Sequence, residues 1–204
     1  MNIIIITGPT CTGKTILSNK IAEIFKDTII IKTDSYYRDN LYIKLLSTFI
    51  NDIYDRLISI KSRELMNTIN SIYNKKKSVL FYNYDFRTRH SSILSRPITY
   101  NNKSRFVILE GVFAHRLNLD YKKTINIICK ENKELCYQRR LKRDKTERAR
   151  NTKEVNNRFS KSWSLYFKNV NKFTNDNEII YINQSKKESF NNLLKTLKTI
   201  KIKN

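Results

Sequence analysis

The stretch G-P-T-C-T-G-K-T at residues 8–15 has the form G-x-x-x-x-G-K-[ST], in which a glycine-bearing loop cradles phosphate groups. Four consecutive isoleucines and Thr7 precede it, as in a buried strand, and an amphipathic run over 16–25 follows it, as in a helix. The chain has three glycines, and Gly8 and Gly13 bracket this loop. A helix-capping turn is the alternative interpretation. Because strand, loop and helix follow in the required order, the stretch predicts a phosphate-binding loop.

Glycine adopts backbone torsions that are closed to other residues, so such a loop can point its N–H groups at a phosphate. The helix that follows places its positive end at the same point. We expect Lys14 to reach the β- and γ-phosphates of a nucleotide and Thr15 to offer its hydroxyl to Mg²⁺. The residues expected to bind the nucleotide are Gly8, Pro9, Thr10, Cys11, Thr12, Gly13, Lys14 and Thr15.

The length of 204 residues predicts one domain, over 1–204, with its own core. A net charge of +22 and a pI near 10.0 would suit a nucleic acid or another polyanion as partner. However, Lys, Asn, Ile and Tyr are abundant throughout while Ala, Gly and Pro are scarce. That composition is typical of a protein from an AT-rich genome, so nucleic-acid binding is kept as a secondary hypothesis.

The cysteines and the hydropathy pattern indicate in which cellular compartment the protein is expected. The three cysteines have no metal-ligand spacing, which favours a reducing compartment without disulfides. The first predicted strand begins almost at once, which leaves no room for a signal or transit peptide, and no apolar run is long enough to cross a membrane. We expect a cytoplasmic protein, or one in the soluble interior of an organelle with an AT-rich genome, such as a plastid.

Short β-branched runs alternate with longer amphipathic ones along the chain. This alternation predicts an α/β fold with three layers, α/β/α, in which helices cover both faces of a mostly parallel sheet. In such sheets the ligand binds beyond the carboxyl ends of the strands, so residues there are candidates for function. The predicted strands are 3–7, 28–32, 78–82, 105–109, 124–129 and 178–182, and the predicted helices are 16–25, one or two over 40–75, 131–143, 153–170 and 186–203.

Three strand ends carry candidate functional residues. Asp34 follows the second strand, where a carboxylate can take the proton of an acceptor hydroxyl in phosphoryl transfer, or else cap a helix. Rings and charges over 84–91 follow the third strand and suit a flat, polar ligand such as a nucleobase; an ordinary solvated loop is the alternative. Glu110 and Gly111 follow the fourth strand, where the carboxylate can hold the hydration shell of Mg²⁺, or else lie on the surface before a turn.

A run of cations, R-R-L-K-R-D-K-T-E-R-A-R, occupies 139–150. Arginines suit a transferring phosphate because their planar guanidinium binds two oxygens at once and stays charged. Arg140 and Arg143 share one helix face, and Arg148 and Arg150 lie beyond them in a predicted turn or short lid at about 144–152. In so basic a chain, a solvated basic face is the alternative.

Together these motifs resemble those of the uridine kinase family, in the P-loop kinase group that also holds phosphoribulokinase. That family shows a P-loop, then D-S-F-Y-R, Y-D-F-x-[ST]-H-S, an E-G pair and R-R-x-x-R-D-x-x-x-R-x-R. The chain has D-S-Y-Y-R at 34–38, Y-D-F-R-T at 84–88, E-G at 110–111 and the arginine run at 140–150, in the same order. The resemblance covers about residues 2–183.

The resemblance implies a P-loop NTPase fold with an arginine-bearing lid, and a nucleoside kinase of pyrimidine salvage. The γ-phosphoryl group of ATP or GTP would pass to the 5′-hydroxyl of uridine or cytidine, with Mg²⁺ as cofactor. Asp34 would be the base, and members of the family are often homo-oligomers. The implied sets are Asp34, Lys14, Arg143 and Arg148 for catalysis, Arg140 and Arg150 for the donor, Thr15 and Glu110 for the metal, and Tyr37, Tyr84, Phe86, Arg89 and His90 for the acceptor.

Two departures from the family pattern concern the acceptor. The segment F-D-H-P-D-A-F-D, which supplies an aspartate to the ribose, has no clear counterpart; the nearest stretch is 54–59, where Asp55 resembles its first aspartate. Arg89 stands in the column of the histidine that reads the base, and His90 comes one place later. A kinase with a different acceptor therefore remains an alternative.

Two further classes remain open. The octet also looks like the P-loop of adenylate and tRNA isopentenyltransferases, which would explain the basic charge through tRNA binding. Against it, the glutamine expected shortly after Asp34 is absent and the arginine run is left unexplained. The other class is a nucleotide- or nucleic-acid-binding module that has lost catalysis.

Overall fold

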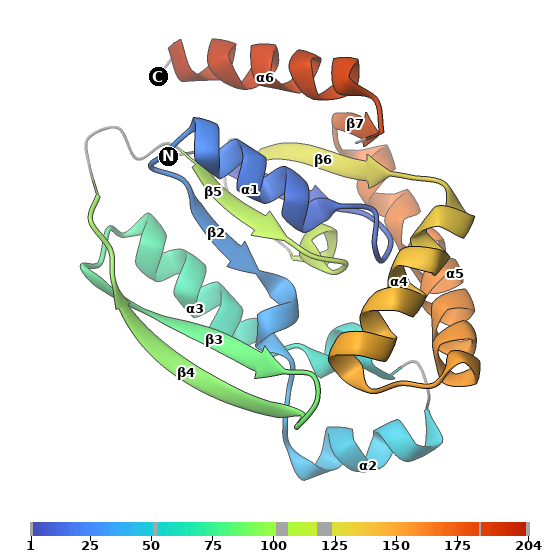
Figure 1. Ribbon diagram of the computed structural model, residues 1–204. Helices are drawn as coiled ribbons and strands as arrows, with labels where there is room; N and C mark the ends of the chain where they lie inside the picture. The colour runs from blue at the N-terminus through green and yellow to red at the C-terminus, as the bar shows by residue number, and fades with distance from the viewer. Residues whose placement is uncertain (1, 51–52, 101–105, 118–123, 184, 203–204) are drawn as a thin grey trace.

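The computed structural model describes residues 2–50, 53–100, 106–117, 124–183 and 185–202. Its centre is a parallel sheet of five strands in the order β2-β5-β1-β6-β7 (Figure 1). The strands are β1 (Asn2–Thr7), β2 (Ile29–Lys32), β5 (Phe106–Glu110), β6 (Thr124–Lys130) and β7 (Ile179–Asn183).

The strand β1 lies in the middle of this sheet, between β5 and β6. All of its residues are buried, because a parallel strand with helices on both faces is apolar along its whole length. Since β1 leads directly into the loop at 8–15, the sheet order places that loop beside the carboxyl ends of both neighbouring strands. Open α/β sheets bind their ligands at this position.

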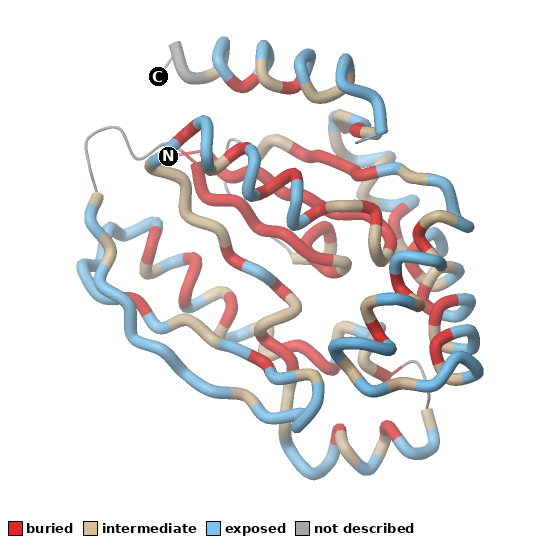
Figure 2. The backbone as a smooth tube through the Cα atoms, viewed as in Figure 1, coloured by how far each residue is buried: buried red, intermediate tan, exposed pale blue. Residues whose placement is uncertain are grey.

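Helices cover both faces of the sheet, and the buried residues lie between the layers (Figures 1 and 2). On one face, α1 and α6 pack against side chains such as Ile4. On the other face, α3 packs in a cluster with Ile3, and α5 packs against Ile128. The predicted three-layer fold is thereby confirmed. These helices are α1 (Lys14–Ile24), α3 (Ser62–Tyr73), α5 (Thr152–Asp176) and α6 (Lys187–Ile202).

The predicted strand 78–82 does not belong to the parallel sheet. It is part of β3 (Ser78–Asp85), which pairs with β4 (His90–Pro97) in a separate antiparallel hairpin beside α3 (Figure 1). The sequence did not predict β4, because most of its residues are exposed and its two apolar residues, Ile93 and Leu94, are adjacent rather than alternating. The stretch 84–91, expected to follow the third strand, therefore forms the tip of this hairpin.

The helices also differ from their predicted bounds. The region 40–75 holds α2 (Leu41–Phe49) and α3, with short 3₁₀ turns between them. The proposed lid at 144–152 is mostly helical: α4 (Lys133–Arg148) and α5 meet there with only 149–151 between them. Ala149 ends α4 in the left-handed conformation, at φ 51°, where a glycine would have signalled the end from the sequence. Outside the described residues lie 51–52, Arg105 of the predicted strand 105–109, residue 203 of the last predicted helix, and the side chain of Asp55.

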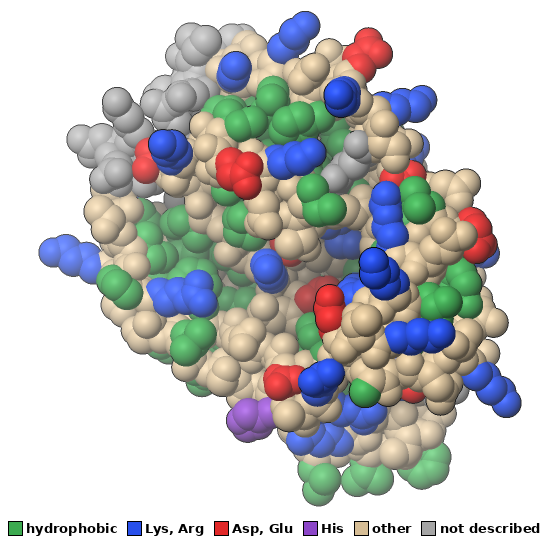
Figure 3. Space-filling model, viewed as in Figure 1, with side chains coloured by type: hydrophobic (Ala, Val, Ile, Leu, Met, Phe, Trp, Pro, Cys, Tyr) green, Lys and Arg blue, Asp and Glu red, His purple; other side chains and the backbone are tan. Residues whose placement is uncertain are grey.

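None of the helices in the described ranges is long and apolar enough to cross a membrane. Figure 3 shows the lysine and arginine side chains spread over one face of the molecule, among polar and apolar groups. A nucleic-acid-binding surface would concentrate these cations in a stripe or patch. On the visible face, their distribution therefore fits the compositional explanation of the net charge.

Candidate active site

The loop at 8–15 folds around the side chain of Lys14. The Nζ atom of Lys14 donates to the carbonyl oxygens of Gly8 at 3.0 Å and Pro9 at 2.8 Å, and the side chain is largely buried. Thr12 Oγ1 donates to the same Pro9 carbonyl at 2.9 Å. A Cβ atom on Gly8 would lie 2.6 Å from the carbonyl oxygen of Cys129, so the close approach to β6 requires glycine. The loop thus holds one cation where phosphates are expected to bind.

A buried carboxylate lies beside the first turn of α1. Thr15 Oγ1 is 3.0 Å from both carboxylate oxygens of Glu110, which is 5% exposed. Burial raises the pKa of Glu110, and the negative charge of Asp34 raises it further. Two neighbouring carboxylates and a hydroxyl favour a cation, and oxygen ligands are those that Mg²⁺ prefers. The residues therefore fit Mg²⁺, which would be held by Thr15 and Glu110 and would neutralise charge on the phosphates.

No cluster of three or more His, Cys, Asp or Glu side chains suited to a metal occurs among the described residues.

Asp34 lies in the short 3₁₀ turn Thr33–Tyr36 that follows β2. Gly111 allows this turn to approach the end of β5: a Cβ atom there would lie 1.8 Å from Thr33 Oγ1 and 3.1 Å from Asp34 Oδ1. The charge of Asp34 acts on Glu110 and on two arginines of α4, Arg143 and Arg148. The predicted base, metal contacts and catalytic arginines are therefore brought together at the carboxyl ends of β2 and β5.

The two arginines of the predicted helix face, Arg140 and Arg143, and the two of the predicted lid, Arg148 and Arg150, surround the carboxylate of Asp144, which is 0% exposed. Arg143 donates to Oδ1 through Nε at 2.9 Å and Nη2 at 2.7 Å, and Arg150 donates to Oδ2 at 2.8 Å. Arg140 Nε lies 3.5 Å from Oδ2 and Arg148 Nε lies 3.7 Å from Oδ1. Burial alone would raise the pKa of Asp144, but the arginines lower it.

The arginines of this cluster differ in what else they contact. Arg140 Nη1 donates to Ser162 Oγ of α5 at 2.6 Å, which ties the two helices together. Burial lowers the pKa of Arg148 to about 10, and the charge of Arg143 adds to that effect. The guanidinium of Arg148 stacks over the ring of Phe86, 3.8 Å from its centroid. Arg148 therefore joins α4 to the tip of the β3–β4 hairpin.

The hairpin tip and α4 are also joined by Arg87. Its side chain donates to the carbonyl oxygens of Glu147 at 3.0 Å and Thr146 at 3.3 Å. Behind this contact is a cavity of about 50 Å³, whose aromatic rings touch one another, with 5.3 Å between the centroids of Tyr37 and Tyr84. A cavity of this volume has room for only a few water molecules, so a nucleoside-sized acceptor requires the hairpin and α4 to separate. It is lined by Tyr37, Tyr54, Tyr84, Phe86, Arg89, Arg140, Arg148, Arg150 and Arg158.

Most of the residues predicted to contact the acceptor line this cavity, but His90 does not. Its side chain is 72% exposed and lies 3.6 Å from Asp39. Arg89 does reach the cavity, where it donates to Ser47 Oγ at 3.3 Å.

Sequence reasoning missed three residues of the site: Asp144, Tyr54 and Arg158. A signal for Asp144 was present, because it is four residues from both Arg140 and Arg148 and so shares their helix face. Tyr54 and Arg158 carried no comparable signal, because they lie on segments far apart in the chain that meet only in the fold.

The strand order, the glycine-bounded loop after β1 and the carboxylates at the ends of β2 and β5 define a P-loop nucleotide-binding protein of the kinase type. A model of the family described as "Phosphoribulokinase / Uridine kinase family" matches residues 3–188. The chain belongs to that family, and it is therefore a kinase. No curated protein matches the chain.

Solved structures with low sequence identity share the fold. A "putative fructose transport system kinase" from Silicibacter sp. TM1040 aligns with a TM-score of 0.63 at 12% identity, over 82% of this chain and 84% of that one. The YGR205w protein aligns with a TM-score of 0.60 at 16% identity, over 88% of this chain and 85% of that one. A "possible uridine kinase" from Bacillus stearothermophilus aligns with a TM-score of 0.57 at 13% identity, over 87% of this chain and 86% of that one. At these identities the likeness concerns the fold alone.

Proposed function

We propose that the protein is a nucleoside kinase that transfers the γ-phosphoryl group of ATP or GTP to the 5′-hydroxyl of uridine or cytidine. The observation that carries the proposal is the position of Asp34, whose carboxylate lies next to Glu110 and in the field of two α4 arginines. A base for an acceptor hydroxyl belongs between the phosphate-binding loop and the acceptor pocket.

In the proposed reaction, the oxygen of the acceptor hydroxyl forms a bond to the γ-phosphorus as the bond from that phosphorus to the β,γ-bridging oxygen breaks. Asp34 takes the hydroxyl proton, and the nucleoside diphosphate leaves. Lys14 turns from the loop carbonyls to the β- and γ-phosphates, and Arg143 and Arg148 stabilise the charge on the transferring group. Thr15 and Glu110 would hold Mg²⁺, which would supply positive charge to offset that of the phosphates.

The aromatic rings of the acceptor cavity support a flat, heterocyclic acceptor. The ring centroids of Tyr84 and Phe86 are 5.2 Å apart, and the two rings are nearly perpendicular. A nucleobase that enters would therefore contact the face of one ring and the edge of the other. A second candidate, a kinase of the same group with a different acceptor, is favoured by Arg89. Within the described part of the chain, Arg89 has no carboxylate partner, and it lines the acceptor cavity together with Arg158. Two cations beside one cavity suit an acceptor that carries negative charge.

The test is a screen for acceptor-dependent release of ADP from Mg²⁺–ATP. Uridine and cytidine are expected to stimulate release. Asp34→Asn is expected to abolish it while ATP still binds, and Asp176→Asn, at the exposed end of α5, is the matched control that leaves it unchanged. Full activity of Asp34→Asn would remove that residue from the role of base.

Other outcomes of the screen separate the alternatives. Release with an anionic acceptor but with no nucleoside supports the second candidate. Consumption of dimethylallyl diphosphate with tRNA or AMP, without ADP release, supports an isopentenyltransferase. Tight, salt-sensitive RNA binding without turnover of either kind supports a module that has lost catalysis.

A further inference from the structure

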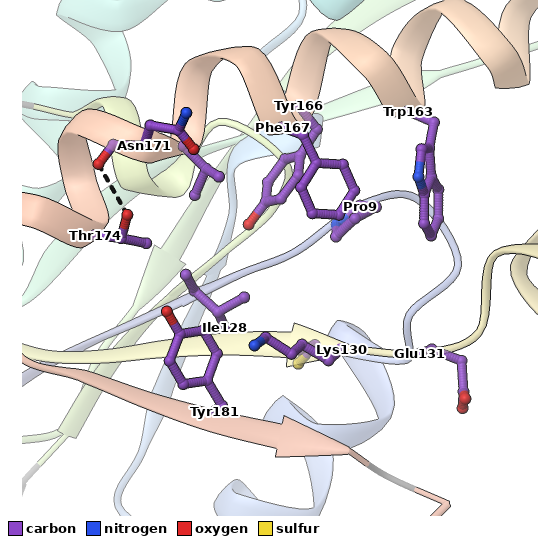
Figure 4. A pocket seen from close by; sticks show the side chains of 12 residues that line it. Pro9, Ile128, Lys130, Glu131, Trp163, Tyr166, Phe167, Asn171, Thr174 and Tyr181 are labelled. Carbon is purple, nitrogen blue, oxygen red and sulfur yellow. Dashed lines mark hydrogen bonds between the residues drawn. The ribbon is translucent and has the colours of Figure 1, made fainter.

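A second pocket lies on the far side of the sheet from α1, between α5 and the carboxyl-terminal halves of β6 and β7 (Figure 4). Its volume is about 340 Å³, in the range of small-molecule sites and well above the 50 Å³ of the acceptor cavity. It is lined by Pro9, Ile128, Cys129, Lys130, Glu131, Trp163, Tyr166, Phe167, Val170, Asn171, Thr174 and Tyr181.

Four of the twelve residues that line this pocket are aromatic. Trp163, Tyr166 and Phe167 extend from α5 toward the sheet, and Tyr181 lies opposite them on β7 (Figure 4). Phe167 is 48% exposed and Tyr181 is 47% exposed. Exposed apolar side chains that lie together, rather than scattered singly, mark a binding site, and the faces and edges of these rings suit a planar aromatic ligand.

The charge of the pocket is positive. Lys130 Nζ lies 3.6 Å from the ring centroid of Tyr181 and, within the described part of the chain, has no carboxylate partner. The neighbouring Glu131 does not compensate it, because its carboxylate bonds to Ser185 and Arg139 and points away from the pocket (Figure 4). A ligand with an anionic group beside its ring therefore complements both the rings and the ammonium group of Lys130, which lacks an anionic partner in the described part of the chain.

The pocket is also continuous with the back of the phosphate-binding loop. Its wall includes Pro9, whose carbonyl oxygen accepts hydrogen bonds from Lys14 and Thr12. A ligand packed against Pro9 would hold this carbonyl in place and so keep Lys14 bonded to the loop. ATP needs that same lysine turned toward its phosphates, so the two ligands favour different positions of one side chain.

We propose that this pocket binds a small planar aromatic anion and that its occupation weakens ATP binding at the loop. The pocket shares Pro9 with the phosphate-binding loop but shares no lining residue with the acceptor cavity, so the inference does not depend on which acceptor the enzyme uses. Coupling of this kind is reciprocal: ATP must weaken binding of the aromatic anion by the same factor.

The binding test uses the chain's one tryptophan, Trp163, which lines the pocket and gives a single indole N–H resonance in a ¹H–¹⁵N spectrum. The probe is 2-naphthoate, and 2-naphthamide is its neutral counterpart. Naphthoate is expected to shift the indole signal saturably and to bind about threefold to fivefold more tightly than the amide, as an exposed ion pair allows.

Two variants locate the ligand, and a third is the control. Lys130→Gln is expected to remove the difference in affinity between naphthoate and naphthamide. Phe167→Ala is expected to weaken the binding of both probes without disturbing the core, since this ring is half exposed. Lys161→Gln changes an exposed lysine of α5 that does not line the pocket and is expected to bind both probes like the parent.

Coupling is measured by displacement of a fluorescent ATP analogue, with and without saturating naphthoate. In the parent protein, naphthoate is expected to lower the apparent affinity for ATP about fivefold or more. The same naphthoate concentration is expected to lower the ATP affinity of Lys130→Gln by a smaller factor. An unsaturable indole shift, equal binding of acid and amide, or an unchanged preference in Lys130→Gln would overturn the binding site. Saturable binding with unchanged ATP affinity would overturn its regulatory role.

Discussion

The replacement of Asp144 by asparagine should reveal how far the arginine cluster depends on one carboxylate. Asn has nearly the same shape, so the change removes the negative charge and leaves the packing in place. Arg143 and Arg150 each lose a charge-assisted hydrogen bond, of 2.7 Å and 2.8 Å, and Arg140 and Arg148 lose a nearby counter-charge.

Breaking a buried ion pair from one side costs about 3–5 kcal/mol. The side chains of Arg143, Arg148 and Arg150 retain exposures of 29%, 15% and 16%, so water can solvate them in part. We therefore expect the lower end of that range, about 3 kcal/mol of unfolding free energy. In a chain of this size it corresponds to a fall in Tm of roughly 6–12 °C.

The assay is urea unfolding at neutral pH, with Glu147→Gln as the control. Glu147 is an exposed acid on the same helix, so the identical chemical change there should alter stability by about 0.5 kcal/mol or less. The acceptor-dependent rate of Asp144→Asn is expected to fall about 10²-fold, because the arginines lose their positions. A stability loss below about 1 kcal/mol, together with an unchanged rate, would refute the view that Asp144 organises the cluster.

Three further predictions concern single residues. Arg148→Ala is expected to lower kcat about 10³-fold, while the control Lys142→Ala leaves kcat nearly unchanged. A loss below about threefold for Arg148→Ala would show that Arg148 belongs to a solvated basic face and has no catalytic role. Gly111→Ala places a Cβ atom 1.8 Å from Thr33 Oγ1 at φ +150°, so we expect urea unfolding to show a loss of about 2–4 kcal/mol. Burial lowers the pKa of His115 from 6.5 to about 4, so its neutral form stabilises the fold fully above pH 6.5. That contribution is lost as the pH falls, by about 2 kcal/mol between pH 7.5 and pH 5. His115→Gln should lack this part of the pH dependence, and parallel curves for the two proteins would contradict it.

The fold was predictable from the sequence where apolar runs and motif spacing were strong. The four isoleucines of β1 and the shorter run Ile127-Ile128-Cys129 of β6 have the continuous hydrophobicity of strands buried on both faces. Because carboxyl ends of parallel strands meet at one edge, Asp34 and Glu110 could be expected near the loop before any coordinates were known. The structure places them so close that the charge of one acts on the other.

Features that depend on non-local packing were not predictable. The strand β4 is nearly all exposed, so no periodicity marks it, and its pairing with β3 is decided by the hairpin rather than by burial. The return of Arg150 to Asp144 depends on Ala149 in the left-handed conformation, for which an alanine gives no warning. The pocket behind the phosphate-binding loop joins Pro9 to residues more than a hundred positions away.

The directions of the pKa shifts distinguish the structural charges of the site from those that await a ligand. In a self-contained ion pair, the pKa of the acid falls and that of the base rises, as at Asp144 and Arg143. Glu110 and Arg148 show the reverse: the pKa of the acid rises and that of the arginine falls, because each is buried beside a like charge. Folding alone gives no reason to bury like charges together. A divalent cation at Glu110 and a triphosphate at Arg148 would each supply the opposite charge that favours the ionised form, so both shifts are consistent with a site for Mg²⁺ and a nucleotide.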